Sequence, residues 1–106
     1  MDSISEKNRP NIVFLFPDQL RSDFLSCYGA GFLDTPNIDA IAEGGTRYQN
    51  SYSASPLCVP ARTSLLTGMN AVRNGVLDNL HAIRADHAEI GIHTWPEILS
   101  RSGYYT

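Results

Sequence analysis

The sequence predicts an α/β fold, with a mixed, mostly parallel sheet flanked by helices that is incomplete in this chain. Residues 11–16 (NIVFLF) form an uninterrupted apolar run, which is typical of a strand buried on both faces. Helix signals follow this run at three places, and only two or three segments have strand character. With 106 residues, the chain is expected to be one domain at most, and its unfinished sheet indicates that it is part of something larger.

Two polar side chains follow the first predicted strand. Residues 1–10 are expected to form a flexible lead-in, and the apolar run at 11–16 ends at Pro17. Asp18 and Gln19 come directly afterwards. Ligands of open α/β sheets bind at the carboxyl ends of the strands, so these two residues are candidate ligand-binding residues.

A helix is predicted over residues 37–43. Thr35 is a suitable N-cap and Pro36 suits the first helical position. Gly44 suits a left-handed stop at the other end. The polar segment 46–53 (TRYQNSYS) is then predicted to form a second strand.

A second helix is predicted over residues 60–67, opened by Pro60 and ended by Gly68. Cys58 would then face the positive end of the helix dipole, and Arg62 lies one helical turn further along the same side. This arrangement suits an anionic tetrahedral group such as sulfate or phosphate. The alternative is that Cys58 is a small buried apolar residue beside a surface arginine.

The last predicted elements are a turn, a helix and the start of a strand. Residues 74–75 (Asn-Gly) mark a tight turn. Thr94 and Glu97 form a capping-box pattern, and the helix that they begin should stop at Gly103. Residues 104–106 would begin the next strand.

Composition excludes several functional classes. Eight Lys and Arg against eleven Asp and Glu give a net charge of -3, so a nucleic-acid partner is not expected. No apolar window of about 18 residues occurs, so no membrane span is expected. No secretory signal is recognisable, which favours a cytoplasmic protein. The two cysteines, Cys27 and Cys58, are too few for a disulfide framework.

Five segments match one known family in consistent order. They are NIVFLFPDQL at 11–20, CYG at 27–29, TPNID at 35–39, CVPARTSLLTG at 58–68 and GYYT at 103–106. Together they resemble the N-terminal part of the type I sulfatases, whose signature is Cys-x-Pro-x-Arg. The resemblance implies an alkaline-phosphatase-like fold in which residues 11–106 begin the catalytic domain. The rest of that domain would follow Thr106.

The resemblance also implies a nucleophile and a reaction. Cys58 would be oxidised to formylglycine by a separate formylglycine-generating enzyme, which recognises Pro60 and Arg62. One hydroxyl of the hydrated aldehyde would attack the sulfur of a small-molecule sulfate ester and expel the alcohol. The other hydroxyl would then lose its proton, so that sulfate leaves by elimination and the aldehyde is restored. Arg62 would position the aldehyde. Cys58 and Arg62 are therefore the predicted catalytic residues.

The resemblance implies a metal site as well. Asp18 and Gln19 match an adjacent pair of metal ligands, and the modified Cys58 would be a further ligand. Ca²⁺ is the expected ion, with Mg²⁺ and Mn²⁺ as alternatives. Most sulfatases have two Asp at the pair, and Asp-Gln is similar to the phosphonate monoesterase and choline-sulfatase branches. Asn79, 21 residues after Cys58, is the predicted substrate-binding residue that hydrogen-bonds the transferred group.

Two other functions stay open at this point. One is a phosphonate monoester or phosphodiester hydrolase that uses the same nucleophile. The other is that the 106-residue chain by itself is inactive.

The three histidines fall in no recognisable motif and are expected to be surface or core residues: His81, His87 and His93.

Overall fold

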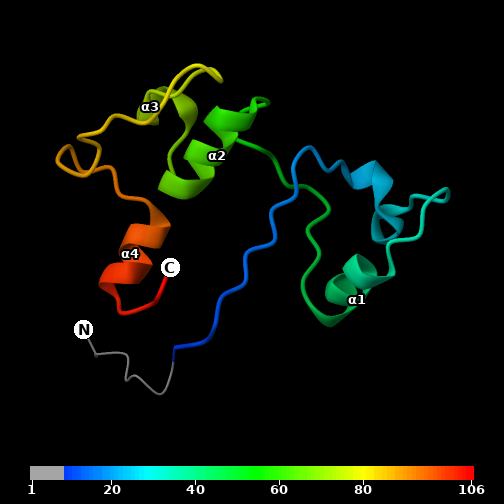
Figure 1. Ribbon diagram of the computed structural model, residues 1–106. Helices are drawn as coiled ribbons and strands as arrows, with labels where there is room; N and C mark the ends of the chain where they lie inside the picture. The colour runs from blue at the N-terminus through cyan, green and yellow to red at the C-terminus, as the bar shows by residue number, and fades with distance from the viewer. Residues whose placement is uncertain (1–8) are drawn as a thin grey trace. The chain divides into compact units, whose positions relative to one another are not determined.

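The computed structural model describes residues 9–106, so the predicted lead-in over residues 1–10 falls almost wholly outside the described part. The chain divides into two compact units, Met1–Tyr48 and Gln49–Thr106 (Figure 1). The described part of the first unit contains the short 3₁₀ helices η2 (Ser22–Phe24) and η3 (Ser26–Tyr28) and the helix α1 (Pro36–Gly44). The second unit contains α2 (Cys58–Thr67), α3 (Ala71–Asn74) and α4 (Trp95–Arg101).

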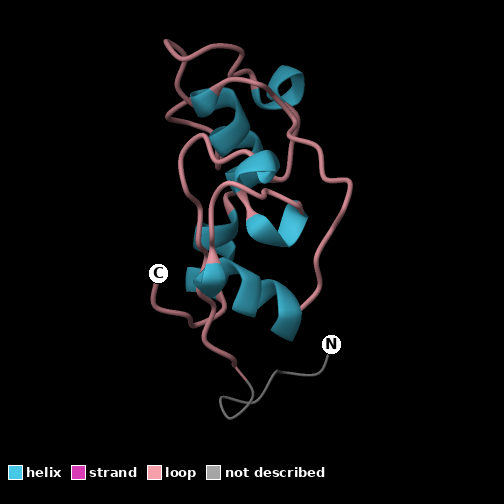
Figure 2. Cartoon of the chain, turned by 90° about the vertical axis from the view of Figure 1, so that its right-hand side faces the viewer, coloured by secondary structure: helices cyan, strands magenta, loops and turns pink. Residues whose placement is uncertain are grey.

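Residues 9–106 contain no β-strand (Figure 2), so the strands predicted at 11–16, 46–53 and 104–106 are absent here. A strand exists only when a neighbouring strand pairs with its backbone N–H and C=O groups. The side chains of the 11–16 segment are exposed as well, with 80% of Val13 and 70% of Leu15 accessible to solvent. The predicted sheet is therefore not realised within this part of the chain.

In the first unit, Asp39 joins the start of α1 to η3. Its Oδ2 accepts a hydrogen bond from Ser26 Oγ (2.6 Å), and its Oδ1 accepts from the Cys27 backbone N–H (2.9 Å) and Thr35 Oγ1 (3.0 Å). These hydrogen bonds lower the pKa of Asp39, with the bond from Ser26 contributing most. A single carboxylate thus connects α1 to two residues of η3 that lie 13 and 12 positions earlier in the sequence.

Helix α1 begins where the sequence predicts, but the predicted side-chain cap at its start and the predicted left-handed glycine at its end are both absent. Thr35 occupies the N-cap position without a side-chain capping bond, because its hydroxyl is used by Asp39 and Ser26. Gly44 is the last helical residue, and Gly45 follows it in an extended conformation (φ −138°). The predicted left-handed stop at Gly44 is therefore wrong.

In the second unit, the predicted C-terminal end of α2 and the predicted capping box of α4 are confirmed, but the predicted start of α2 at Pro60 is wrong. Helix α2 starts two residues earlier than predicted and ends at Gly68, which has a left-handed conformation (φ 66°). The Thr94 and Glu97 capping box is present at the start of α4. The predicted turn at 74–75 is the end of α3, a helix that the sequence analysis missed. Helix α2 contacts both α3 and α4.

The described part of the chain buries few apolar side chains. The buried apolar residues among residues 9–106 are Leu25 in the first unit and Pro60, Val76 and Ile92 in the second. No helix in this range is long and apolar enough to cross a membrane. With so little apolar burial, polar contacts such as those of Asp39 carry a larger share of the local order.

The lowered pKa of Asp39 predicts a pH-dependent contribution to stability. Its stabilising effect is complete above the unfolded-state pKa of about 3.9 and is lost as the pH falls through the lower folded-state pKa. We therefore expect Asp39→Asn to lower the urea unfolding midpoint of the full-length protein near neutral pH. The difference from the wild type should shrink below about pH 4.

The control for this experiment is Asp34→Asn, which changes an exposed aspartate of the same unit. It should leave the midpoint close to the wild-type value. A difference between Asp39→Asn and the wild type that stays constant from neutral to acidic pH would contradict the prediction.

Candidate active site

The start of α2 presents Cys58 to solvent. Cys58 is the first residue of the helix and its side chain is exposed. The interpretation of Cys58 as a buried apolar residue is therefore wrong. Arg62, which is partly buried, lies four residues later and so on the same side of the helix.

The first turn of α2 takes a hydrogen-bond acceptor from a distant part of the chain. Leu57 at the N-cap position provides no side-chain cap, and Pro60 has no N–H group. The Val59 N–H instead donates to Asn79 Oδ1, at 3.0 Å. Asn79 thus contacts the residue next to Cys58, and the structure brings together the predicted site residues of the second unit.

The electrostatics of this turn favour an anion. The N-terminus of a helix carries unpaired N–H groups and the positive end of the helix dipole. The first turn of α2 contains no acidic residue, and Arg62 adds a full positive charge one turn along. Sulfate and phosphate groups are the ligands that such a combination stabilises best.

Asp18 and Gln19 belong to the first unit, where they form a turn after the 11–16 segment and are exposed. Gln19 has a φ of 46°, an uncommon value for a residue other than glycine. The pair offers one carboxylate and one amide oxygen, which are suitable ligands for Ca²⁺ or Mg²⁺. However, Ca²⁺ takes about six to eight oxygen ligands, and residues 9–106 contain no group of three His, Cys, Asp or Glu that could hold a metal. The pair fits the predicted ion in kind but does not complete its coordination.

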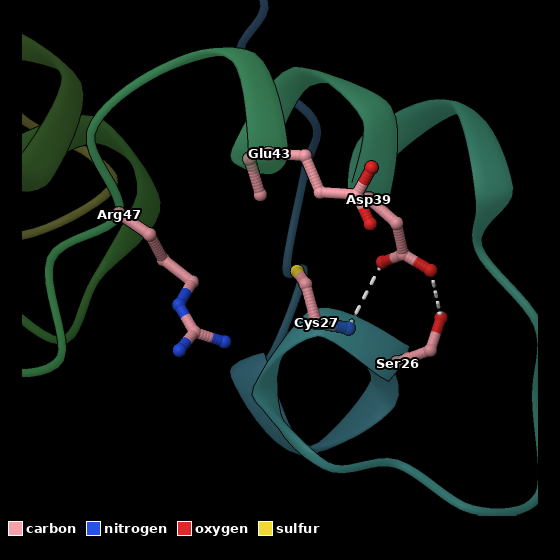
Figure 3. Close-up of a pocket in the computed structure, with 6 residues that line it drawn as sticks. Ser26, Cys27, Asp39, Glu43 and Arg47 are labelled. Carbon is pink, nitrogen blue, oxygen red and sulfur yellow. Dashed lines mark hydrogen bonds between the residues drawn. The ribbon is translucent and has the colours of Figure 1, made fainter.

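The two cysteines have different surroundings. Cys27 is partly buried and lines a pocket of about 450 Å³ together with Asp39, Glu43 and Arg47 (Figure 3). Burial raises the pKa of the Cys27 thiol, and the neighbouring Asp39 raises it further. A raised pKa keeps the thiol protonated and poorly nucleophilic. This environment agrees with a structural function for Cys27.

Two of the three histidines form ring contacts with the protein backbone. His81 Nδ1 accepts a hydrogen bond from the Leu77 N–H (3.1 Å), and His87 Nδ1 lies 2.8 Å from the Ile92 carbonyl oxygen. His93 Nδ1 is buried and has no hydrogen-bond partner among the described residues. No sequence motif connects His81 to Leu77, so this contact could not be predicted from the sequence.

Comparison with known proteins identifies the family. A model of the sulfatase family matches residues 10–106. N-acetylglucosamine-6-O-sulfatase from Bacteroides thetaiotaomicron is 38% identical over 101 residues, which cover 95% of this chain and 17% of that protein. Choline-sulfatase from Rhizobium meliloti is 39% identical over 98 residues (92% and 18%). N-acetylgalactosamine-6-sulfatase from Rattus norvegicus is 43% identical over 103 residues (90% and 20%).

These proteins are hydrolases of the sulfatase class, and the chain belongs to the sulfatase family. It spans about a fifth of the length of these curated relatives. The family implies an alkaline-phosphatase-like α/β fold, although the described residues contain no strand. No solved structure matches the chain.

The different surroundings of the two cysteines predict different reactivities. In full-length protein isolated with Cys58 as the thiol, iodoacetamide should alkylate Cys58 several-fold faster than Cys27 near neutral pH. The reason is that Cys58 is exposed, whereas the pKa of Cys27 is raised by burial. A time course of alkylated peptides, followed by mass spectrometry, measures both rates.

The control is the same reaction in urea, where unfolding removes both environments and the two rates should converge. Equal rates in the native protein would contradict the prediction.

Proposed function

We propose that the full-length protein hydrolyses a sulfate monoester to an alcohol and sulfate, with a formylglycine derived from Cys58 as the nucleophile. The observation that carries this proposal is the exposed Cys58 at the start of α2, next to Val59, whose N–H donates to Asn79 Oδ1, in a chain of the sulfatase family. A reacting group must be accessible to its substrate, and Cys58 meets this requirement. The named relatives are sulfatases as well, which supports a sulfate ester as the substrate.

The residues around Cys58 would bind and orient the sulfate group. The modification supplies a hydrated aldehyde, whose two hydroxyls allow attack and release from the same carbon. Arg62 would hold the anionic group by its charge and position the modified side chain. Asn79 uses its Oδ1 to accept from Val59, so its Nδ2 is the atom that would donate to a sulfate oxygen. Pro60 and Arg62 would also be recognised by the formylglycine-generating enzyme.

Asp18 and Gln19 would hold a divalent cation, with Ca²⁺ preferred and Mg²⁺ and Mn²⁺ as alternatives. When bound, the cation would neutralise negative charge on the sulfate oxygens. The modified Cys58 is proposed as a further ligand. The remaining ligands are proposed to come from the rest of the catalytic domain, beyond Thr106.

A second candidate is hydrolysis of a phosphonate monoester or phosphodiester by the same residues. Asp18-Gln19, with one negative charge fewer than an Asp-Asp pair, is the observation that favours it. Comparing turnover of an aryl sulfate with that of a phenylphosphonate ester separates the two functions. Faster turnover of the sulfate supports the first proposal, and faster turnover of the phosphonate supports the second.

The nucleophile is tested in full-length protein produced together with the formylglycine-generating enzyme. Mass spectrometry of the peptide that contains residue 58 should show the aldehyde in place of the thiol. Cys58→Ala should lower kcat for an aryl sulfate by about a thousandfold or more, because the covalent route is removed.

Cys27→Ala is the matched control, since it removes the other cysteine, which belongs to the first unit and has a raised pKa, and it should keep most of the activity. The proposal fails if residue 58 remains a thiol in active enzyme, or if Cys58→Ala retains the wild-type kcat.

A further inference from the structure

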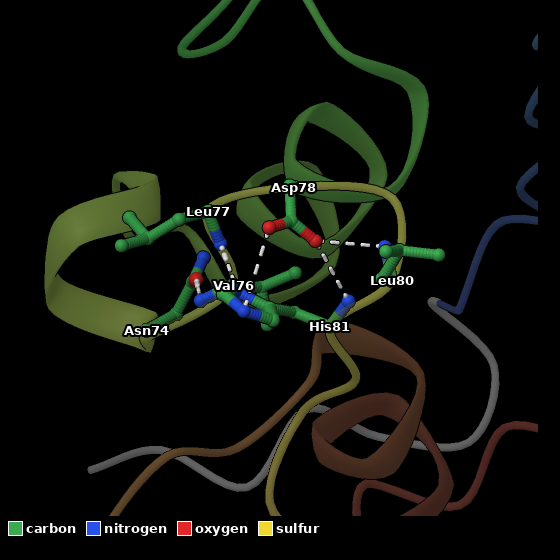
Figure 4. A network of polar contacts seen from close by, with 6 residues as sticks. All are labelled: Asn74, Val76, Leu77, Asp78, Leu80 and His81. Atoms are coloured by element: carbon green, nitrogen blue, oxygen red, sulfur yellow. Dashed lines mark hydrogen bonds and ion pairs between the residues drawn. The ribbon is translucent and has the colours of Figure 1, made fainter.

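The loop that carries Asn79 is closed by its own side chains (Figure 4). His81 Nδ1 accepts a hydrogen bond from the Leu77 N–H (3.1 Å). Asp78 Oδ1 accepts from the N–H groups of Leu80 (2.8 Å) and His81 (3.1 Å). His81 Nε2 lies 3.5 Å from Asp78 Oδ2. We call residues 77–81, closed in this way, the Asn79 loop.

The segment that leads into the Asn79 loop is fixed to α2 by the buried side chain of Asn74. Asn74 is only 4% exposed, and its Nδ2 donates to Ser64 Oγ in α2 (3.3 Å) and to the Met69 carbonyl (3.2 Å). Its Oδ1 accepts from the N–H of Val76, which is fully buried. The loop therefore leaves α3 in a fixed direction, and its conformation is then set by Asp78 and His81.

The Asn79 loop contacts the first turn of α2. Asn79 lies at its centre, and its Oδ1 accepts from the Val59 N–H at 3.0 Å. We infer that Asp78 and His81 are positioning residues that hold Asn79 against the turn that carries Cys58. The inference rests on the proposed function, because it assigns these residues a part in orienting the group that Asn79 and Cys58 bind.

The hydrogen bonds of His81 argue against an acid–base function for this residue. Because Nδ1 accepts from Leu77, the proton of the neutral ring lies on Nε2, which faces Asp78. Nδ1 is thus committed to the loop, and Nε2 lies 3.5 Å from the Asp78 carboxylate of the same loop. Holding an exposed five-residue loop in one conformation removes the entropy cost that Asn79 would otherwise meet on binding a substrate.

The first test measures the contact itself and needs no enzyme activity. Hydrogen–deuterium exchange at the Val59 amide of the full-length protein reports whether Asn79 Oδ1 is in place. Asn79→Ala and His81→Ala should both speed this exchange by about tenfold. His81→Asn restores an acceptor near the position of Nδ1 and should restore most of the protection. Val72→Ala, which truncates an 83% exposed side chain on α3, is the matched control and should leave the exchange unchanged.

The second test is a double-mutant cycle on kcat for an aryl sulfate. His81→Ala should lower kcat by about tenfold with a smaller effect on KM, since a small displacement of an orienting group is costly. In an Asn79→Ala background, adding His81→Ala should cause no further loss, because His81 acts only through Asn79. A general loss of stability would instead lower activity in both backgrounds.

The outcomes separate this inference from the proposed function. Faster Val59 exchange in His81→Ala, together with coupling to Asn79 in kcat, supports it. Unchanged Val59 exchange in His81→Ala, or independent effects on kcat, overturns it. If the exchange results are as expected but neither the wild type nor any variant hydrolyses sulfate esters, the proposed function is wrong while the positioning of Asn79 by His81 is supported.

Discussion

The hydrogen bond from Val59 to Asn79 is the interaction on which the candidate site depends. Helix α2 begins at Cys58 without a capping side chain of its own, and Pro60 removes one of its first-turn donors. The acceptor for Val59 comes from a loop twenty residues later in the sequence. Because Asn79 supplies the acceptor for the Val59 N–H, it helps to fix the position of the first turn of α2. The location of Cys58 is therefore linked to the conformation of the Asn79 loop.

Polar side chains organise both units of the chain. In the first unit, Asp39 connects α1 to η3 through Ser26 and Cys27. In the second, the buried Asn74 connects the end of α3 to α2. A buried polar group such as Asn74 is costly to leave without a hydrogen-bond partner, so its bonds to Ser64 and Met69 stabilise the second unit. Such contacts matter here because few apolar side chains are buried in the described part of the chain.

Helices and strands differ in what they require from the rest of a protein. A helix pairs its backbone within itself, so local signals predict where α1, α2 and α4 form in residues 9–106. A strand must pair with another strand, and residues 11–16 find none among the described residues. Their exposed apolar side chains are the consequence. The described residues therefore do not form the sheet of the α/β fold that the sulfatase family implies.

The sequence alone determined the features that depend on neighbouring residues. These include the left-handed end of α2 at Gly68, the capping box of Thr94 and Glu97, and the Cys-x-Pro-x-Arg motif that indicates the family. The tertiary structure decided that Cys58 is exposed and that the Thr35 hydroxyl donates to Asp39 instead of capping α1. It also decided that His81 accepts a hydrogen bond from Leu77 and so closes the Asn79 loop. Propensity and spacing report only the free energy of local conformations. The partner of Val59 depends on how the chain folds back on itself, and no periodic pattern records that contact.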